Sequence, residues 1–235
     1  MRRCHLFRRA AGALILAATL AGCAGDPEPE DPRQQPPQGP RLYVTNEISG
    51  DISVIDLADQ TVLATIPVGK RPRGIRLSPD GTTLYVALSG SPIAGPNVDE
   101  STLPPPDRRF DGIGMIDVRS GKLIGTLPGG SDPEQLAVSR DGRRLFIANE
   151  DAGEVSVVEV AAAKIVGRIP VGGEPEGVDL SPDGRWVYVT SEEDNQVAVT
   201  DTESLTLAAM LPVGARPRST AFLPDGSRAY VSAEN

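Results

Sequence analysis

The chain has 235 residues, with 23 basic and 32 acidic side chains and a formal net charge of −9. This acidic balance excludes a nucleic-acid partner, which would need a basic stripe on the protein surface. It favours repulsion from anionic surfaces and leaves the fold undecided.

The N-terminal segment 1–22 has the pattern of a bacterial export signal. Four arginines and no acidic residue accompany an apolar run at 10–20, which is too short to span a bilayer. The run ends in LAGC at 20–23, which resembles a bacterial lipobox. That resemblance implies cleavage before Cys23 and a lipid on this residue, anchoring an exported protein on the periplasmic or surface side of the cell envelope. The alternative is an ordinary signal peptide that happens to contain a cysteine.

Removal of this signal peptide would restrict the chemistry of the remaining chain. The histidine is His5 and the cysteines are Cys4 and Cys23. The mature chain would hold no histidine and no free thiol, which excludes Ser-His-Asp and Cys-His nucleophiles and internal disulfides. Zinc, copper or haem held by His or Cys is excluded on the same ground. We therefore expect no catalytic residue, no metal site and no cofactor.

A proline-rich segment comes next. Residues 23–40 combine the lipidated cysteine with a tether that has six prolines among positions 24–40. Such a composition stays extended, at about 3.1 Å per residue, and packs no core. We expect it to hold the folded part, 41–235, away from a membrane that the protein contacts through its lipid alone.

From residue 41 onward the chain is periodic. The run LYVTN at 42–46 recurs at 84–88, 145–149, 187–191 and 229–233, in steps of 42, 61, 42 and 42 residues. β-branched residues alternate with polar ones and Gly-rich turns follow, so these units are strands. A strand-rich repeat of about 42 residues predicts an all-β propeller with four-stranded antiparallel blades.

The strand count predicts an incomplete ring. The chain opens with strands two to four of one blade, continues with three full blades, and ends with strands one and two of another. This gives 17 strands, whereas seven blades would need 28. We expect a fragment, or a chain short of roughly 110 residues at this blade length; closure into four blades is the alternative.

Several short motifs carry a family resemblance. YVTN at 43–46, SVIDL at 53–57 and the segment 65–81 resemble the YVTN-repeat β-propeller family. The elements at 149–151 and 174–177 are similar to those of PQQ-dependent catabolism-associated β-propeller proteins. The resemblance implies a propeller fold and an accessory role in periplasmic oxidation that depends on a quinone cofactor, without the cofactor being carried by this chain.

Charged residues repeat in the crossover before each inner strand, where the sequence reads RPR, DPE, EPE and RPR in turn. In a propeller these crossovers share a face with the loops that join strands two and three. This face could hold the blades together by Arg–carboxylate pairs, or it could bind a protein partner or a small anionic ligand. The candidate residues are Arg71, Arg73, Asp132, Glu134, Glu174, Glu176, Arg216 and Arg218 in the crossovers, with Glu47, Glu150 and Glu192 in the loops.

The 61-residue step contains a loop insertion at 89–111, on the same face. Long loops on rigid scaffolds often carry recognition, and Pro104–Pro106 would stiffen this one, although a passive excursion is equally consistent with the sequence. Elsewhere we expect structural roles. Asp56, Asp117, Glu159 and Asp201 should hydrogen-bond the turn after strand three, and Trp186 should belong to the core.

The sequence therefore favours a non-catalytic binding or scaffold propeller of the bacterial envelope. One alternative is a propeller-type lactonase or related hydrolase, in which Arg/Glu pairs polarise a carbonyl and orient water. The absence of a histidine from the mature chain weakens this alternative. Another is a passive surface-layer component.

Overall fold

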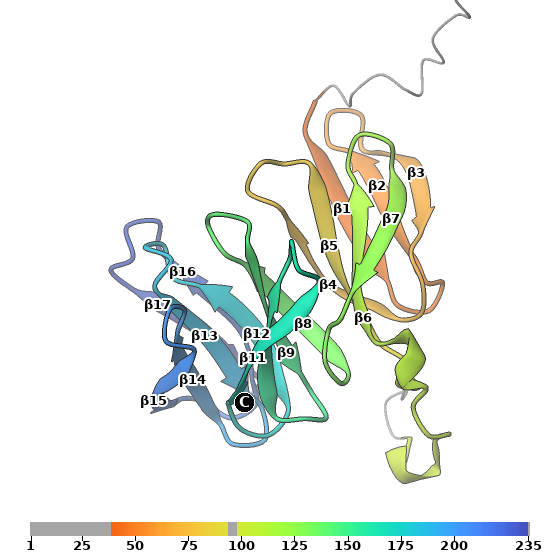
Figure 1. The fold of residues 1–235 in the computed structure, drawn as a ribbon. Coiled ribbons are helices and arrows are strands. Elements are labelled where there is room, and N and C mark those ends of the chain that lie inside the picture. The colour runs from red at the N-terminus through yellow and green to blue at the C-terminus, as the bar shows by residue number, and fades with distance from the viewer. Residues whose placement is uncertain (1–38, 94–97, 235) are drawn as a thin grey trace, which may run out of the picture. The chain divides into compact units, whose positions relative to one another are not determined.

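The computed structural model describes residues 39–93 and 98–234. The predicted signal peptide, Cys23 and most of the tether lie outside this range. The described residues form seventeen strands, with short 3₁₀ helices in the insertion. Figure 1 labels most of the strands, and the sheets follow one another in chain order.

The strands form five antiparallel sheets: three of four strands, one of three and one of two. The predicted fold class, with three full blades and two partial ones, is confirmed. The first sheet contains β1 (Arg41–Asn46), β2 (Asp51–Asp56) and β3 (Thr61–Pro67); the second β4 (Pro72–Leu77), β5 (Thr83–Leu88), β6 (Gly112–Asp117) and β7 (Lys122–Leu127); the third β8 (Pro133–Val138), β9 (Arg144–Asn149), β10 (Glu154–Glu159) and β11 (Lys164–Pro170); the fourth β12 (Pro175–Leu180), β13 (Trp186–Ser191), β14 (Gln196–Asp201) and β15 (Thr206–Pro212); the last β16 (Pro217–Phe222) and β17 (Ala229–Ala233).

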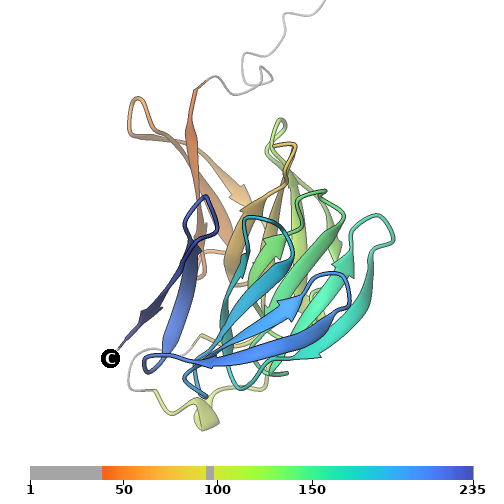
Figure 2. The same ribbon diagram turned by 90° about the vertical axis from the view of Figure 1, so that its left-hand side faces the viewer.

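The hydrophobic core lies between neighbouring blades. Alternation along the strands places Ile52 and Val54 of β2 in one buried cluster with Val86 of β5. A second cluster joins the second and third blades, and a third joins the third and fourth, where Phe146 is completely enclosed. The inner strands β4, β8, β12 and β16 contact one another in succession (Figure 2). This packing aligns the crossovers that precede them.

The β-turns between strands one and two repeat in every blade whose inner strand is present. In the first of them Asp80 accepts hydrogen bonds from the Ser78 hydroxyl and the Thr82 N–H, at 2.6 and 3.0 Å. The glycine of each turn has a positive φ, for example +74° at Gly81, which glycine adopts without steric cost. Three of these turns read Ser/Leu-Pro-Asp-Gly, whereas the one at 139–142 has Arg140 in place of proline.

The acidic residues at the end of strand three have mainly the predicted role. Asp56, Asp117 and Asp201 accept hydrogen bonds from backbone N–H groups of the following turn. Glu159 differs, because its longer side chain reaches Arg144 at 3.6 Å. Trp186 is half-buried, so the prediction that it belongs to the core is only partly correct.

Candidate functional site

The crossovers have a shared backbone geometry that orients their charged side chains. The residue before the proline of each inner strand has a positive φ between 43° and 55°. The following proline disfavours the right-handed helical region at this position, and tertiary hydrogen bonds fix the left-handed one. In each case its carbonyl accepts a hydrogen bond from the chain just beyond strand two of the same blade. The four residues are Arg71, Asp132, Glu174 and Arg216.

Arg73 lies two residues after Arg71 in the same crossover. It is the centre of the first ion-pair cluster. Its side chain is only 9% exposed and reaches from the second blade to three carboxylates of the third. It lies 2.6 Å from Glu150, 3.6 Å from Asp132 and in direct contact with Glu134. Buried guanidinium and carboxylate groups need such partners, because each charge loses its hydration.

Arg216 and Arg218 form a second cluster between the fourth and fifth blades. Arg218 lies 2.5 Å from Glu176 and 2.7 Å from Glu234, and it also contacts Glu192. Arg216 pairs with the same Glu192 and Glu234, at 2.5 and 2.7 Å. The two arginines therefore share two carboxylates, and one of these, Glu192, is only 7% exposed.

Glu176 is electrostatically connected to both clusters. Burial raises its pKa from 4.5 to about 7, while the charge of Arg218 acts in the opposite direction. Glu150 raises this pKa further and Arg73 lowers it, although both belong to the first cluster. Glu176 is thus an acidic group with a perturbed pKa at a charged surface, which is a feature of functional sites and of structural ion-pair networks alike.

The other predicted residues lie at the margin of these clusters. Arg71 pairs with Glu47 of the first blade at 3.2 Å. Glu174 accepts a hydrogen bond at its carbonyl from the Glu192 N–H at 3.0 Å. We use the name charged loop face for the surface made by the crossovers and the loops after strand two, and the predicted residues lie on it.

The insertion packs onto the charged loop face. It includes η2 (Glu100–Thr102) and η3 (Arg108–Phe110). Arg108 contacts Asp151 of the third blade and donates to Ser91 at 3.1 Å. Asp111 accepts hydrogen bonds from the N–H groups of Gly90 and Asp132, at 2.7 and 3.1 Å. Sequence reasoning located the insertion but missed these anchors, because nothing in the repeat corresponds to them.

A pocket of about 370 Å³ lies between the insertion and the charged loop face. Leu103 and Pro104–Pro106 supply an apolar wall, and Arg108 belongs to the insertion side as well. The opposite side is charged and consists of Arg71, Asp132, Glu150 and Asp151. A pocket with one apolar wall and a few fixed charged groups has the general character of a binding site.

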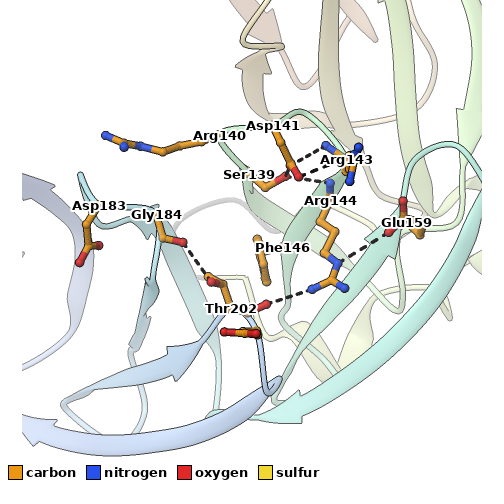
Figure 3. Close-up of a pocket in the computed structure, with 11 residues that line it drawn as sticks. Ser139, Arg140, Asp141, Arg143, Arg144, Phe146, Glu159, Asp183, Gly184 and Thr202 are labelled. Atoms are coloured by element: carbon orange, nitrogen blue, oxygen red, sulfur yellow. Dashed lines mark hydrogen bonds and ion pairs between the residues drawn. The ribbon is translucent and has the colours of Figure 1, made fainter.

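A second pocket, of about 500 Å³, lies between the third and fourth blades near their β-turns (Figure 3). Arg144 lines it, donating to the Thr202 carbonyl at 3.0 Å and lying 3.6 Å from Glu159. Arg143 lies 3.8 Å from Asp141. Its arginines are matched by Asp141, Glu159, Asp183 and Glu203, so its lining has no excess of positive charge.

No candidate metal centre is found among the described residues. Within 39–93 and 98–234, no group of three or more His, Cys, Asp or Glu side chains is arranged to hold a metal ion. In the same part of the chain, no helix has both the length and the apolar composition needed to cross a membrane.

Two protein-family models match parts of the chain and show the family to which it belongs. The family model of the seven-bladed β-propeller lactonases matches residues 34–166. The chain belongs to this lactonase family. A second model, of the cytochrome D1 heme domain, matches residues 112–229 of the same propeller. Family membership here establishes the propeller fold, because propellers support unrelated activities.

Individual proteins are similar to parts of this chain in sequence, and solved structures are similar to it in fold. The propeller is 31% identical over 109 residues to antigen Lp49 of Leptospira interrogans, covering 46% of this chain and 23% of the antigen. A protein of unknown function from Desulfotomaculum acetoxidans has a TM-score of 0.66 at 18% identity, over 83% of this chain and 59% of that one. Hydrazine synthase of Kuenenia stuttgartiensis has a TM-score of 0.55 at 20% identity, over 82% and 77%. The chain thus spans less than a quarter of the antigen.

Proposed function

We propose that this member of the lactonase family is a non-catalytic binding propeller that recognises a protein partner through its charged loop face. The observation that carries the proposal is the packing of the insertion on that face, which leaves a pocket with a proline wall and a charged wall. Such a pocket can accept an extended segment of a partner, whose polar groups add contacts around the Arg108–Asp151 pair.

The ion pairs favour a protein partner over a small anionic ligand. Each of Arg71, Arg73, Arg216 and Arg218 already has one or more carboxylates within 4 Å. A small anion would have to displace these carboxylates and leave them unpaired, at a large cost in free energy. A protein can instead add contacts around the existing network.

We also propose a subcellular location for the protein. The lipobox at Cys23 and the proline-rich tether support display from a membrane of the bacterial envelope, on the periplasmic or surface side. The resemblance to PQQ-dependent catabolism-associated propellers supports an accessory role in periplasmic oxidation. A passive surface-layer component would share the anchor but would need no partner in the pocket.

Two neighbouring arginines of the insertion provide the test. Arg108 lines the pocket, whereas Arg109 is 85% exposed and pairs with Asp107. After cross-linking in intact cells and recovery of the protein, we expect Arg108→Ala to lose the partner and Arg109→Ala to retain it. Equal recovery by both variants would contradict recognition through this pocket.

A lactonase is the second candidate function, favoured by the family and by Glu176. An acid with a pKa of about 7 can act as a general base near neutral pH. Turnover of a panel of lactones by the purified protein, lost on Glu176→Gln, would establish this function and overturn the first. We expect no turnover above the uncatalysed rate.

The described residues do not fit a haem held in the usual way. Among residues 39–93 and 98–234 there is no histidine or cysteine, the side chains that most often ligate haem iron. The match to the cytochrome D1 heme domain therefore contributes to the fold and adds no cofactor to the proposed function.

A further inference from the structure

The pocket between the third and fourth blades differs from its counterpart one blade earlier. Its volume is about 500 Å³, whereas the equivalent space between the second and third blades measures about 200 Å³. Each of these three blades has all four strands, so both spaces lie between complete neighbours. Because the repeat gives both places the same kind of β-turn, the lining side chains distinguish the two.

The β-turn of the third blade brings three arginines to the larger pocket. The chain reads SRDGRR from residue 139, where the second blade reads SPDGTT from 78 and the fourth reads SPDGRW from 181. The smaller space has uncharged residues at the corresponding positions. The arginines of the larger pocket are Arg140, Arg143 and Arg144, and their counterparts in the smaller space are Pro79, Thr82 and Thr83.

Arg140 occupies the position of a packing proline and adds a charge to it. A Cβ added at Gly142 would lie 3.5 Å from Cδ of Pro79, and one added at Gly184 would lie 3.0 Å from Cδ of Arg140. The stem of Arg140 therefore packs on the next turn as the proline does. Its guanidinium extends further, toward the side of the pocket where Asp183 and Gly184 lie (Figure 3). Within the described part of the chain this guanidinium has no hydrogen bond or ion pair, so it is available to a ligand.

The two other arginines differ in how firmly they are held. Arg144 donates to the Thr202 carbonyl at 3.0 Å and thereby links the two blades. Arg143 is 78% exposed and lies 3.8 Å from Asp141, which is too far for a hydrogen bond. Oδ1 of Asp141 is already used by the hydrogen bonds of its own turn. Arg140 and Arg143 thus have donors to spare for an anionic group.

Glu203 supplies the opposite charge from the fourth blade. It lines the pocket, its side chain is exposed, and its carboxylate accepts no hydrogen bond and joins no ion pair among residues 39–93 and 98–234. Figure 3 shows its neighbour Thr202 across the pocket from Arg140 and Asp141. No earlier blade has an acidic residue at this position, where the chain has Ala58, Arg119 and Ala161.

We propose that this pocket binds a short peptide with free ends, whose carboxylate is held by Arg140 and Arg143 and whose ammonium group is held by Glu203. The planar guanidinium group matches a carboxylate in geometry and charge. A ligand with both charges suits a lining in which arginines and carboxylates are balanced, and the volume is within the usual range of ligand sites. The pocket is separate from the charged loop face, so this site adds to the proposed function and does not depend on it.

Triglycine and its two blocked forms test the need for both charges. N-acetyl-triglycine lacks the ammonium group, and triglycinamide lacks the carboxylate. In calorimetric titrations at constant ionic strength we expect saturable binding of triglycine and affinity at least about tenfold lower for both blocked forms. No binding of triglycine, or equal binding of a blocked form, would overturn the proposal.

Variants that restore residues of the repeat test the assigned side chains. Arg140→Pro gives the turn the residue found at Pro79, and Glu203→Ala gives the residue found at Ala161, so the fold should be retained. Each should lower triglycine affinity about tenfold. Arg185→Thr removes an arginine from the fourth-blade turn outside the pocket lining and should leave affinity unchanged. Wild-type affinity in Arg140→Pro or Glu203→Ala would contradict the assigned contacts, as would an equal loss in Arg185→Thr.

Discussion

Replacing Arg73 by alanine is expected to lower the free energy of unfolding by about 3–5 kcal/mol. The substitution leaves Asp132, Glu134 and Glu150 close together without the cation that they share. Asp132 and Glu134 are buried, so water cannot restore what the guanidinium supplied. Urea unfolding followed by circular dichroism measures the loss.

Arg109→Ala is the matched control for this prediction. Its guanidinium also pairs with a carboxylate, Asp107 at 2.6 Å, but 85% of the side chain is exposed. An exposed pair contributes about 0–1 kcal/mol, so stability should hardly change. If Arg73→Ala cost no more than Arg109→Ala, the buried cluster would not stabilise the propeller.

The second large effect is a loss of stability as the pH rises. In the folded protein the pKa of Glu176 is about 7, against an ordinary value of 4.5. Below about pH 4.5 this group is protonated in both states and contributes its full stabilisation. Between pH 4.5 and 7 the unfolded chain loses the proton while the folded protein retains it, so the free energy of unfolding falls. Above pH 7 the contribution is flat.

Glu176→Gln isolates this contribution. Glutamine mimics the protonated acid, and Arg218 keeps Glu192 and Glu234 as partners. We expect the variant to gain stability relative to wild type on the order of 2 kcal/mol between pH 4.5 and 7.5. Parallel pH profiles of stability for the two proteins would contradict the raised pKa.

The sequence predicts much of this fold because the repeat supplies the same information several times. Runs such as LYVTN at 42–46 became strands at the expected places, β1 among them. The crossover charges were also predictable, because chain connectivity forces every crossover onto one face. The partners of these charged residues were harder to predict. For example, the joint contact of Arg216 and Arg218 with Glu234 depends on how far each side chain reaches.

Features that depend on contacts between non-repeated residues were not predictable. The docking of Arg108 against Asp151 joins the insertion to a loop more than forty residues later. The edge-to-face ring contact between Phe222 and Tyr188 likewise joins one blade to the preceding one. A periodic pattern identifies the strand of each residue, and the contact between two blades appears only in three dimensions.

The most direct measurement for the account is a double-mutant cycle between Arg73 and Glu134, which lie in neighbouring blades. The central claim is that opposite charges of successive crossovers stabilise the charged loop face by pairing. It predicts that Arg73→Met and Glu134→Gln are coupled by about 1.5 kcal/mol or more in the free energy of unfolding. Additive effects, with a coupling below about 0.5 kcal/mol, would contradict the claim.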